Sequence, residues 1–279
     1  MSEDLLPGGW PEARPLAVAV NIMLEGWTDD SAPGIGPMGN PLKPGILDLQ
    51  ARSWAEYGPK TGAWRLLDLL AAAGVRAVWY VNGIVAERYP ELVRAVAQGG
   101  HPVAAHGWAQ NILPAYQTSE EEPADLRRCT EILAANAGTP PIGWLSPRCT
   151  PSPRTTALLA GAGYRWHADI FDADLPYFLD TPAGPIVAMP FTMEVNDMPL
   201  YVRYGAEPAA YSRIFERIAG QWQAIGNRPG VLDLTVHAHV FGRPYGIVEF
   251  QAAIEAARRY PWAWLTDHDR LAALCADAA

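Results

Sequence analysis

Short apolar runs alternate with amphipathic helical stretches along almost the whole chain, and this alternation constrains the fold more than any other feature. Apolar runs rich in β-branched residues predict buried strands, and apolar residues at helical spacing between them predict helices. Repeated strand–helix units are typical of a parallel sheet covered by helices. The predicted strands are residues 16–23, 77–81, 102–105, 142–146, 165–169, 186–190, 231–237 and 262–265.

Helices are predicted in most of the intervals between these strands. Residues 63–73 carry leucines at helical spacing and are followed by Gly74, which can adopt the left-handed conformation that ends a helix. Ser119 and Glu122 have the spacing of a capping box and predict a helix that runs to residue 137, before Gly138. The other predicted helices are residues 153–162, 209–224, 249–259 and 267–274.

The chain length of 279 residues allows either two small domains or one barrel-sized domain. No internal repeat or serine-rich linker divides the chain. We therefore expect a single α/β domain, a (β/α) barrel over residues 16–275 with an N-terminal extension at residues 1–15. In such a barrel the chemistry collects where the strands end and the following loops begin.

Residues 26–59 lack any periodicity and contain several prolines and glycines. A segment of this length is unusual as a connection inside a compact domain. Such segments serve as lids or binding elements, or they take part in contacts between subunits. We expect a lid-like insertion here, and both roles stay open.

Composition and charge exclude several classes of protein. The net charge is −9 and Lys and Arg form no cluster, which argues against nucleic acid and anionic lipid as partners. Three widely spaced cysteines, Cys129, Cys149 and Cys275, form neither a closed set of disulfides nor a CxxC motif. A secreted disulfide scaffold and a thiolate zinc site are therefore not expected.

The sequence also gives expectations about location and assembly. It has no apolar stretch long enough to span a membrane, and its first residues lack the basic and apolar regions of a signal peptide. We therefore expect a cytoplasmic protein without a membrane partner. Only 18% of the residues are charged and aromatic residues are frequent, which favours a homo-oligomer, a dimer or a tetramer.

Polar residues directly after the predicted strands form a set of candidate functional residues. They are Glu25, Asn82, His106, Arg148, Asp169, Glu194 with Asp197, His237 with His239, and Asp267 with His268. Each also has a structural interpretation, because a carboxylate can cap a loop and an imidazole can be a satisfied core group. His237 and His239 are two residues apart and face the same side of a strand, where two imidazoles need partners. That pairing favours a functional role.

Motifs for nucleophilic side chains and for phosphate binding are missing from the sequence. There is no Gly-x-Ser-x-Gly elbow, and no cysteine has a histidine close to it in the chain. The Gly- and Pro-rich run at residues 33–39 is not followed by a lysine–threonine pair or by a predicted helix. These observations favour water as the nucleophile.

Six segments follow one another in a recognisable order. They are RSWAEYG at 52–58, AERYPELVR at 86–94, GHPVAAHGW at 100–108, DLPY at 174–177, NDM at 196–198 and HAHVFGRP at 237–244. In these segments the chain resembles the polysaccharide deacetylase (carbohydrate esterase family 4) superfamily, and most closely its allantoinase-like branch. The resemblance covers residues 16 to about 270 and implies a distorted (β/α) barrel that hydrolyses a C–N bond of an amide.

The resemblance also assigns roles to individual positions. The first motif of the family has two adjacent acids after the first strand, a general base and then a metal ligand. Leu24 and Glu25 stand at these positions, so only the second acid is present. His106 corresponds to a metal-binding histidine, and Gln110 stands where the family has a second one.

Three later motifs of the family are matched. Arg148 corresponds to its arginine motif, Leu234 and His237 to its Leu-x-x-His motif, and Asp169 to an acidic position of the allantoinase-like branch.

The resemblance further implies that no cofactor is tightly bound, because a tight catalytic zinc site needs three good protein ligands. A weakly held divalent ion, zinc or manganese, would be bound by Glu25, His106 and either Gln110 or Asn111.

Together these observations predict a hydrolase that opens a small cyclic amide, imide or ureide with water as the nucleophile. Glu25 would accept a proton from water, or would hold with His106 an ion that activates it. His237 would protonate the leaving nitrogen, oriented by Asp169 or Arg148. Backbone N–H groups would stabilise the oxyanion. The candidate substrate-binding residues are Trp27, Trp54 and Tyr57 of the lid-like segment, Trp108 beside His106, and Glu194, Asp197 and His239.

Two alternatives stay open. The first is a metal-dependent N-deacetylase of a small N-acetylated sugar or amine. The second is a non-catalytic, ligand-binding member of the family, motivated by Leu24 at the position of the expected base. A small-molecule substrate is favoured over a polymer, since an open sugar groove is usually displayed by a secreted protein.

Overall fold

A computed structural model of the chain describes residues 9–39, 42–43, 45–225 and 229–278. Residues 1–8 of the expected N-terminal extension and residues 40, 41 and 44 of the lid-like segment lie outside the described residues. All strands expected from the sequence are present, and β6 is additional. The strands are β1 (Leu16–Leu24), β2 (Val78–Val81), β3 (Val103–Ala105), β4 (Gly143–Trp144), β5 (Trp166–Ile170), β6 (Tyr177–Leu179), β7 (Ile186–Pro190), β8 (Gly230–His237) and β9 (Ala263–Thr266).

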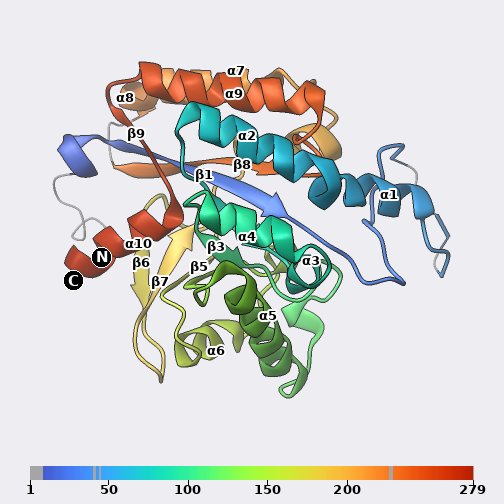
Figure 1. The fold of residues 1–279 in the computed structure, drawn as a ribbon. Helices are drawn as coiled ribbons and strands as arrows, with labels where there is room; N and C mark the ends of the chain where they lie inside the picture. The colour runs from blue at the N-terminus through green and yellow to red at the C-terminus, as the bar shows by residue number, and fades with distance from the viewer. Residues whose placement is uncertain (1–8, 40–41, 44, 226–228, 279) are drawn as a thin grey trace.

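These strands form one curled, nine-stranded sheet at the centre of the molecule (Figure 1). The order is β6-β7-β5-β4-β3-β2-β1-β8, and β9 lies beside the first half of β1. All pairs are parallel except β6 with β7. Among the described residues a single bridge, Asn196 to Thr235, links the segment after β7 to β8. The architecture is a distorted (β/α) half-barrel, so the predicted fold class is confirmed.

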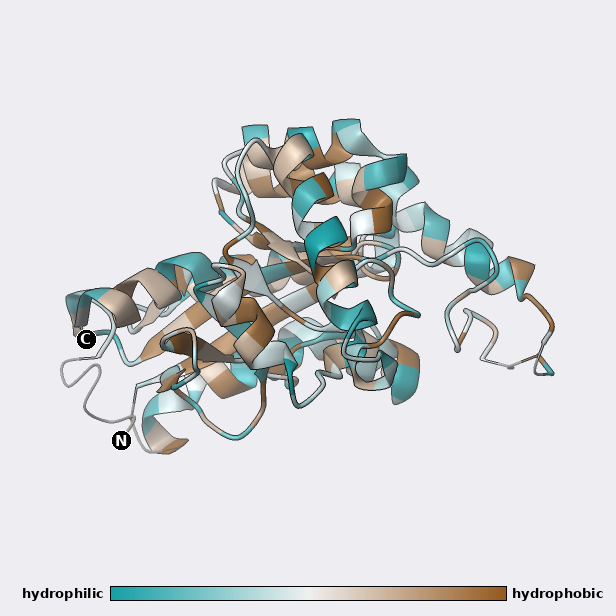
Figure 2. Ribbon diagram, turned by 90° about the horizontal axis from the view of Figure 1, so that it is seen from below, coloured by the Kyte–Doolittle hydropathy of each residue, from teal (hydrophilic) through white to brown (hydrophobic). Residues whose placement is uncertain are grey.

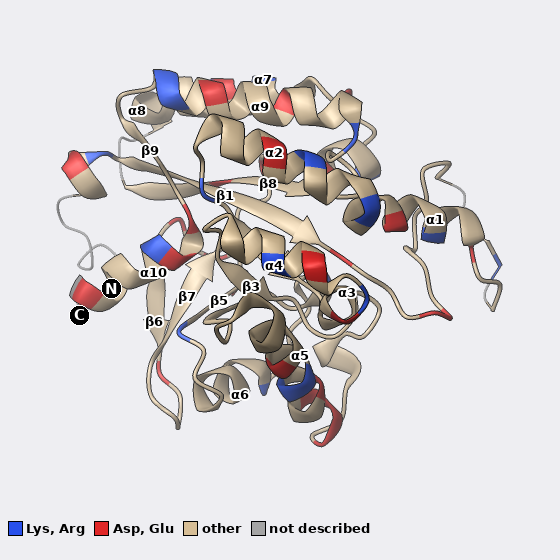
Figure 3. Ribbon diagram, viewed as in Figure 1, with Lys and Arg blue, Asp and Glu red and all other residues tan. Residues whose placement is uncertain are grey.

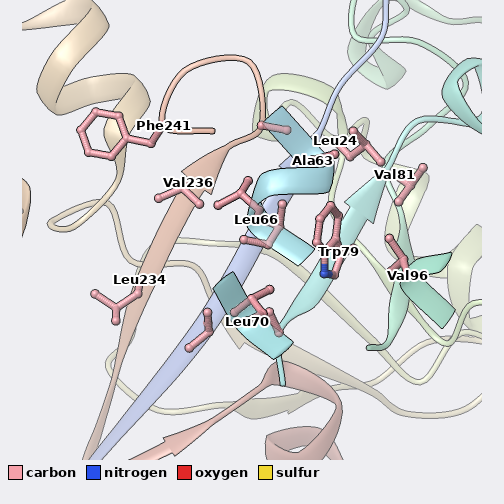
Figure 4. Packing of buried hydrophobic residues seen from close by; sticks show 14 of the residues in the cluster. Leu24, Ala63, Leu66, Leu70, Trp79, Val81, Val96, Leu234, Val236 and Phe241 are labelled. Carbon is pink, nitrogen blue, oxygen red and sulfur yellow. The ribbon is translucent and has the colours of Figure 1, made fainter. Parts of the chain in front are cut away.

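Two apolar layers lie on the two faces of the sheet, as the side-chain alternation of a strand requires. From β1, Leu16, Val18, Val20, Ile22 and Leu24 pack outward against the helices, whereas Ala17, Ala19 and Met23 face the inside of the barrel. Figure 4 shows the outer layer, in which Leu24 lies near Ala63, Trp79 and Val81. Leu24 is fully buried, so the position that matches the family's first acid faces the helix layer.

Helices cover the outside of the sheet, with α2, α7 and α9 along one side and α3, α4, α5 and α6 along the other (Figure 1). Leucines at helical spacing place one stripe of α2 against the core, and Gly74 ends this helix in the left-handed conformation, as expected. The helices are α1 (Leu49–Tyr57), α2 (Ala63–Ala73), α3 (Gly83–Arg88), α4 (Pro90–Gln98), α5 (Glu121–Ala137), α6 (Thr155–Gly161), α7 (Ala210–Gly220), α8 (Trp222–Ile225), α9 (Pro244–Arg259) and α10 (His268–Ala278).

The structure corrects several local predictions. The segment 26–59 is not irregular throughout, since it contains α1, whose first turn is capped by Asp48. Helices α3 and α4 were not predicted, and the helix expected at 209–224 is divided into α7 and α8. The capping box of α5 lies one residue earlier than expected, because Thr118 and Glu121 exchange the two hydrogen bonds.

The lid-like segment, which includes α1, projects from the barrel (Figure 2). Its side chains Met38, Ile46 and Leu49 are 68%, 62% and 67% exposed, although they are apolar. Exposed apolar side chains that gather in one segment mark contact sites. The predicted homo-oligomer stays a prediction, and this segment is where we expect its subunits to meet.

Charged side chains lie mainly on the helices and loops, and the central strands are almost free of them (Figure 3). Asp169 of β5 is one buried exception, and the other is Asp233 of β8. Its carboxylate accepts hydrogen bonds from Asn21 at 2.7 Å and from the backbone N–H of Thr192 at 2.6 Å, and it contacts Nε2 of His268 at 2.7 Å. This network ties β1, β8, α10 and the segment after β7 together beneath the strand ends.

No helix within the described residues has the length and apolarity to span a membrane.

Two glycines allow the start of α2 to approach the turn after β8 backbone to backbone. A Cβ atom on Gly62 would lie 1.9 Å from the carbonyl oxygen of Ala238, and one on Gly242 would lie 2.2 Å from the same atom. Arg65 fixes this contact by donating a hydrogen bond to the carbonyl oxygen of Gly242 at 2.7 Å. The turn that carries His237 and His239 is thereby held against α2.

We expect Gly62→Ala to lower the free energy of unfolding by about 3 kcal/mol, because a backbone carbonyl cannot move aside as a flexible side chain can. Chemical denaturation monitored by circular dichroism measures the change. The matched control is Gly161→Ala in α6, whose added Cβ meets its nearest neighbour at an ordinary 3.9 Å. Equal stability of the two variants would contradict the close approach.

Candidate active site

Most of the predicted site residues meet around one cavity at the carboxyl ends of the strands. The cavity has a volume of about 790 Å³, within the usual range for ligand sites. Glu25 after β1, His106 after β3 and His237 at the end of β8 line it, together with His239 and Gln110. The parallel strands therefore bring together side chains that are far apart in the sequence.

Glu25 lies at the centre of this polar cluster and is only 4% exposed. Its Oε1 lies 3.6 Å from Nε2 of His237 and 3.8 Å from Nε2 of His106, and its Oε2 lies 3.9 Å from Nδ1 of His239. Gln110 donates a hydrogen bond to Oε1 at 2.5 Å. Burial alone would raise the pKa of Glu25, but the charge of His237 and the nearby imidazoles lower it to about 2. Glu25 is therefore an ionised carboxylate at any physiological pH.

His237 is held by a buried carboxylate on the side away from Glu25. Its Nδ1 lies 2.6 Å from Oδ1 of Asp197, and Oδ2 of Asp197 accepts hydrogen bonds from the backbone N–H groups of His237 and Phe241. Burial opposes the imidazolium, but the carboxylates of Asp197 and Glu25 outweigh it and raise the pKa of His237 above 6.5. The predicted orienting residues were Asp169 and Arg148. In the structure, Asp197 is the residue that contacts Nδ1 of His237 and orients the ring. Its side chain is fully buried and is shielded from any substrate.

The other two imidazoles of the cluster are held differently. Nδ1 of His106 donates a hydrogen bond to the carbonyl oxygen of Leu145 at 2.7 Å, which orients the ring so that Nε2 faces Glu25. The edges of Trp27 and Trp54 pack on His239, with ring centroids 5.7 and 4.6 Å away. Burial lowers the pKa of His239 to about 3, so this ring is neutral. Nε2 of His106 and Nε2 of His239 have no partner among the described residues.

Asp169 supports a turn and does not contact His237. Its Oδ1 accepts a hydrogen bond from the backbone N–H of Ser146 at 2.8 Å, and its Oδ2 accepts one from the Ser146 hydroxyl at 2.7 Å. Burial raises the pKa of Asp169 to about 6. Ser146 begins the turn that carries Arg148, whose exposed side chain lines the cavity. Asp169 is therefore a support of the cavity wall.

The lid-like segment provides part of the cavity wall, as expected. Trp27, Trp54 and the stretch from Ser31 to Ile35 line the cavity. Tyr57 lines a neighbouring cavity of about 980 Å³, where the guanidinium of Arg243 stacks 3.9 Å from its ring and Arg65 donates to its hydroxyl. The two cavities share Ile35, Trp54 and Val202 as a common wall. Tyr57 is thus displaced from the predicted position over Glu25.

Besides Tyr57 and Asp197, two further predicted substrate contacts do not line the cavity. Trp108 is 5% exposed and packs against α5, with the guanidinium of Arg128 3.3 Å from its ring centre. Glu194 is exposed on the loop after β7 and does not line the cavity. Arg203 was not predicted, but it does line the cavity, from the π-helical turn Met198–Arg203. That turn follows a loop and not a strand, so the rule that selected the other residues could not find it.

A weakly held divalent ion is the one cofactor expected from the family resemblance. Only Glu25 and His106 are strong donors at the expected positions. The amide nitrogen of Gln110 points to Glu25 as a hydrogen-bond donor, and Asn111 is bonded to Thr28 through both of its amide atoms. Within the described residues, no group of three or more His, Cys, Asp or Glu side chains has the arrangement of a metal site. The residues present do not fit a tight three-ligand ion.

Comparison with known proteins agrees with this geometry. The family model for polysaccharide deacetylases matches residues 55–167. A putative polysaccharide deacetylase of Schizosaccharomyces pombe is 22% identical over 264 residues, which cover 85% of this chain and 79% of that protein.

Two solved structures superpose closely on the chain, each with a TM-score of 0.85. A probable polysaccharide deacetylase from Pseudomonas aeruginosa is 25% identical and covers 95% of this chain and 92% of its own. A PuuE allantoinase is 24% identical and covers 95% of this chain and 91% of its own. The order of the motifs, the half-barrel and these matches agree, and together they support the resemblance of the chain to the polysaccharide deacetylase (carbohydrate esterase family 4) superfamily of hydrolases that act on C–N bonds.

Proposed function

We propose that this protein hydrolyses a C–N bond of a small cyclic amide, imide or ureide, with water as the nucleophile and without a tightly bound metal ion. The observation that carries the proposal is the buried pair of Glu25 and His237, 3.6 Å apart, with Asp197 behind the imidazole. One member of this pair is a permanent carboxylate and the other is a histidine stabilised as the imidazolium. The pair therefore supplies a proton acceptor and a proton donor in one cavity.

The attacking water sits between Glu25 and His106 in this mechanism. Oε1 of Glu25 and Nε2 of His106 are 3.8 Å apart, which lets one water molecule hydrogen-bond to both. Glu25 takes the proton as the oxygen attacks the carbonyl carbon. The hydrogen bond from Gln110 orients the carboxylate.

His237 gives its Nε2 proton to the ring nitrogen as the C–N bond breaks. Loss of the imidazolium charge removes the interaction that holds the pKa of Glu25 low, so Glu25 becomes a stronger base as water's proton is transferred. The two proton transfers therefore assist each other. Asp197 keeps Nδ1 of His237 protonated throughout.

His239 polarises the substrate carbonyl in this account. It is neutral, it lines the cavity, and its Nε2 has no partner among the described residues. A neutral imidazole can donate an N–H hydrogen bond to a developing oxyanion without losing its proton. Trp27 and Trp54 hold the ring and exclude water from it.

A ring substrate, in preference to a polymer, is supported by two observations. Trp27, Trp54 and the stretch from Ser31 to Ile35 of the lid-like segment form a wall of the cavity that holds the reacting carboxylate. The PuuE allantoinase, whose name states that it acts on allantoin, has the same fold over 95% of this chain.

A hydrolysis screen tests the proposal. The purified protein, treated with a chelator, is assayed against allantoin, hydantoins, succinimide, dihydropyrimidines and N-acetyl sugars, with and without added zinc or manganese. We expect at least one cyclic amide to be opened at the same rate with and without metal. Activity on N-acetyl sugars alone, and only with metal, would support the metal-dependent deacetylase. No activity on any compound would support the non-catalytic alternative.

A further inference from the structure

The catalytic cavity carries more positive than negative charge, although the protein as a whole has a net charge of −9. Among the described residues that line the cavity, Glu25 is the one acid, and Arg148 and Arg203 are the permanently charged bases. Neither guanidinium has a hydrogen bond or an ion pair with any other described residue. A cavity of opposite charge to its protein concentrates ligands of the opposite sign.

The two arginines lie in the same part of the cavity. The charge of Arg203 acts on both His237 and Cys149, the residue that follows Arg148, and in each case it opposes part of the rise in pKa. Arg148 follows β4, whereas the reacting residues come from β1, β3 and β8, which occupy the other half of the strand order. Arg203 comes from the turn Met198–Arg203. Both arginines line the same cavity as Glu25 and His237.

The turn that carries Arg148 is held in a strained conformation. Arg148 and Cys149 are successive non-glycine residues with φ of 57° and 54°. Such residues each cost about 1–3 kcal/mol and persist where the surrounding structure holds them. Here the backbone N–H of Cys149 donates a hydrogen bond to the carbonyl oxygen of Ser146 at 2.8 Å. The carboxylate of Asp169 accepts hydrogen bonds from the backbone N–H and the hydroxyl of Ser146. The strain keeps the Arg148 side chain directed at the cavity.

We propose that Arg148 and Arg203 form an anion-binding subsite, so that the enzyme prefers cyclic amides that carry a carboxylate substituent. This inference rests on the proposed function and names its substrate class more closely. A guanidinium binds a carboxylate through two parallel hydrogen bonds, which a neutral ring cannot replace. The volume of about 790 Å³ leaves room for such a substituent beside the ring.

Matched substrate pairs test the subsite. The pairs are dihydrouracil with dihydrouracil-6-carboxylate and hydantoin with hydantoin-5-acetate, assayed with the full-length protein. We expect the wild-type kcat/KM to be at least about tenfold higher for the carboxylated member of a pair. In Arg203→Met, and in the double variant with Arg148→Met, this ratio should fall to near one.

Two controls separate charge from folding. Arg203→Lys keeps the charge and should keep most of the preference, although it loses the bidentate geometry. Arg127→Met removes an equal charge from an exposed site on α5, away from the cavity, and should leave the ratio as in the wild type. Circular dichroism and thermal melting check that each variant folds.

The outcomes distinguish this inference from the proposed function. Equal rates on both members of each pair, unchanged by Arg203→Met, would overturn the subsite and leave cyclic amide hydrolysis intact. If no ring is opened, the proposed function fails, and the subsite is tested by calorimetric titration with succinate. Binding to the wild type that is lost in the double variant would then support the subsite, and no binding to the wild type would overturn it.

Discussion

Replacing Glu25 with glutamine is expected to lower kcat/KM for a cyclic amide by at least about a thousandfold. General base catalysis contributes about 10²- to 10⁴-fold, and Glu25 also stabilises the imidazolium of His237, so this variant loses two effects at once. A glutamine has nearly the same shape and can keep the contact with Gln110 after one amide rotates. The loss should therefore appear in the rate and leave the fold unchanged.

The matched control is Glu194→Gln. Glu194 follows β7 and was predicted in the same way as Glu25, but it is exposed and lies outside the cavity. Its activity should stay within about twofold of the wild type, since surface substitutions are usually neutral. If Glu25→Gln retains more than a tenth of the wild-type rate while Glu194→Gln is fully active, Glu25 is not the base.

Replacing Asp197 with asparagine is expected to lower kcat/KM by about 10²- to 10⁴-fold, although Asp197 cannot touch the substrate. The amide oxygen would stay on the backbone N–H groups of His237 and Phe241, which need an acceptor. The amide NH₂ would then donate a hydrogen bond to Nδ1 of His237. That nitrogen would have to accept, so the single ring proton would lie on Nε2. The imidazole would be neutral, and a neutral imidazole is a much weaker acid toward the leaving nitrogen.

The control for this variant is Asp180→Asn, an exposed carboxylate that lines neither cavity. Rates are measured at several pH values, because a purely structural defect would lower the rate equally at each. In Asp197→Asn the pKa of His237 should fall, so the remaining activity should decline at a lower pH than in the wild type. An unchanged pH dependence would show that Asp197 does not control the proton on His237.

The strands were predictable because their apolar runs are bounded by polar turns, and the structure confirms each of them. The elements that were missed lack such a local signal. Helix α1 follows a run rich in Pro and Gly, and α4 begins at Pro90 directly after the short α3. Strand β6 has only three residues, Tyr177–Leu179, and lies half-buried and antiparallel at the end of the sheet, so its apolar run is too short to predict a strand. These elements depend on contacts that the sequence does not display.

Part of the candidate site was predictable from the positions of the strands. Glu25, His106, His237 and His239 come together because each follows a strand of one parallel sheet. Asp197, expected to contact substrate, takes the orienting role expected of Asp169, because the path of the loop after β7 decides which carboxylate reaches His237; Asp169 instead supports the turn at Ser146. Trp108 was expected at the cavity since it lies two residues after His106, but Gly107 between them has a φ of 66° and turns the chain, so Trp108 is buried away from the cavity.

The pH dependence of kcat/KM for chelator-treated wild-type protein on a cyclic amide tests the central claim most directly. Glu25, with a pKa of about 2, is ionised at every accessible pH, so its titration does not limit the rate. His237 must be protonated, and its pKa is raised above 6.5, so the rate should fall as the pH rises through that raised value. A rate that instead climbs to a plateau at alkaline pH, and appears only when metal is returned, would contradict the account.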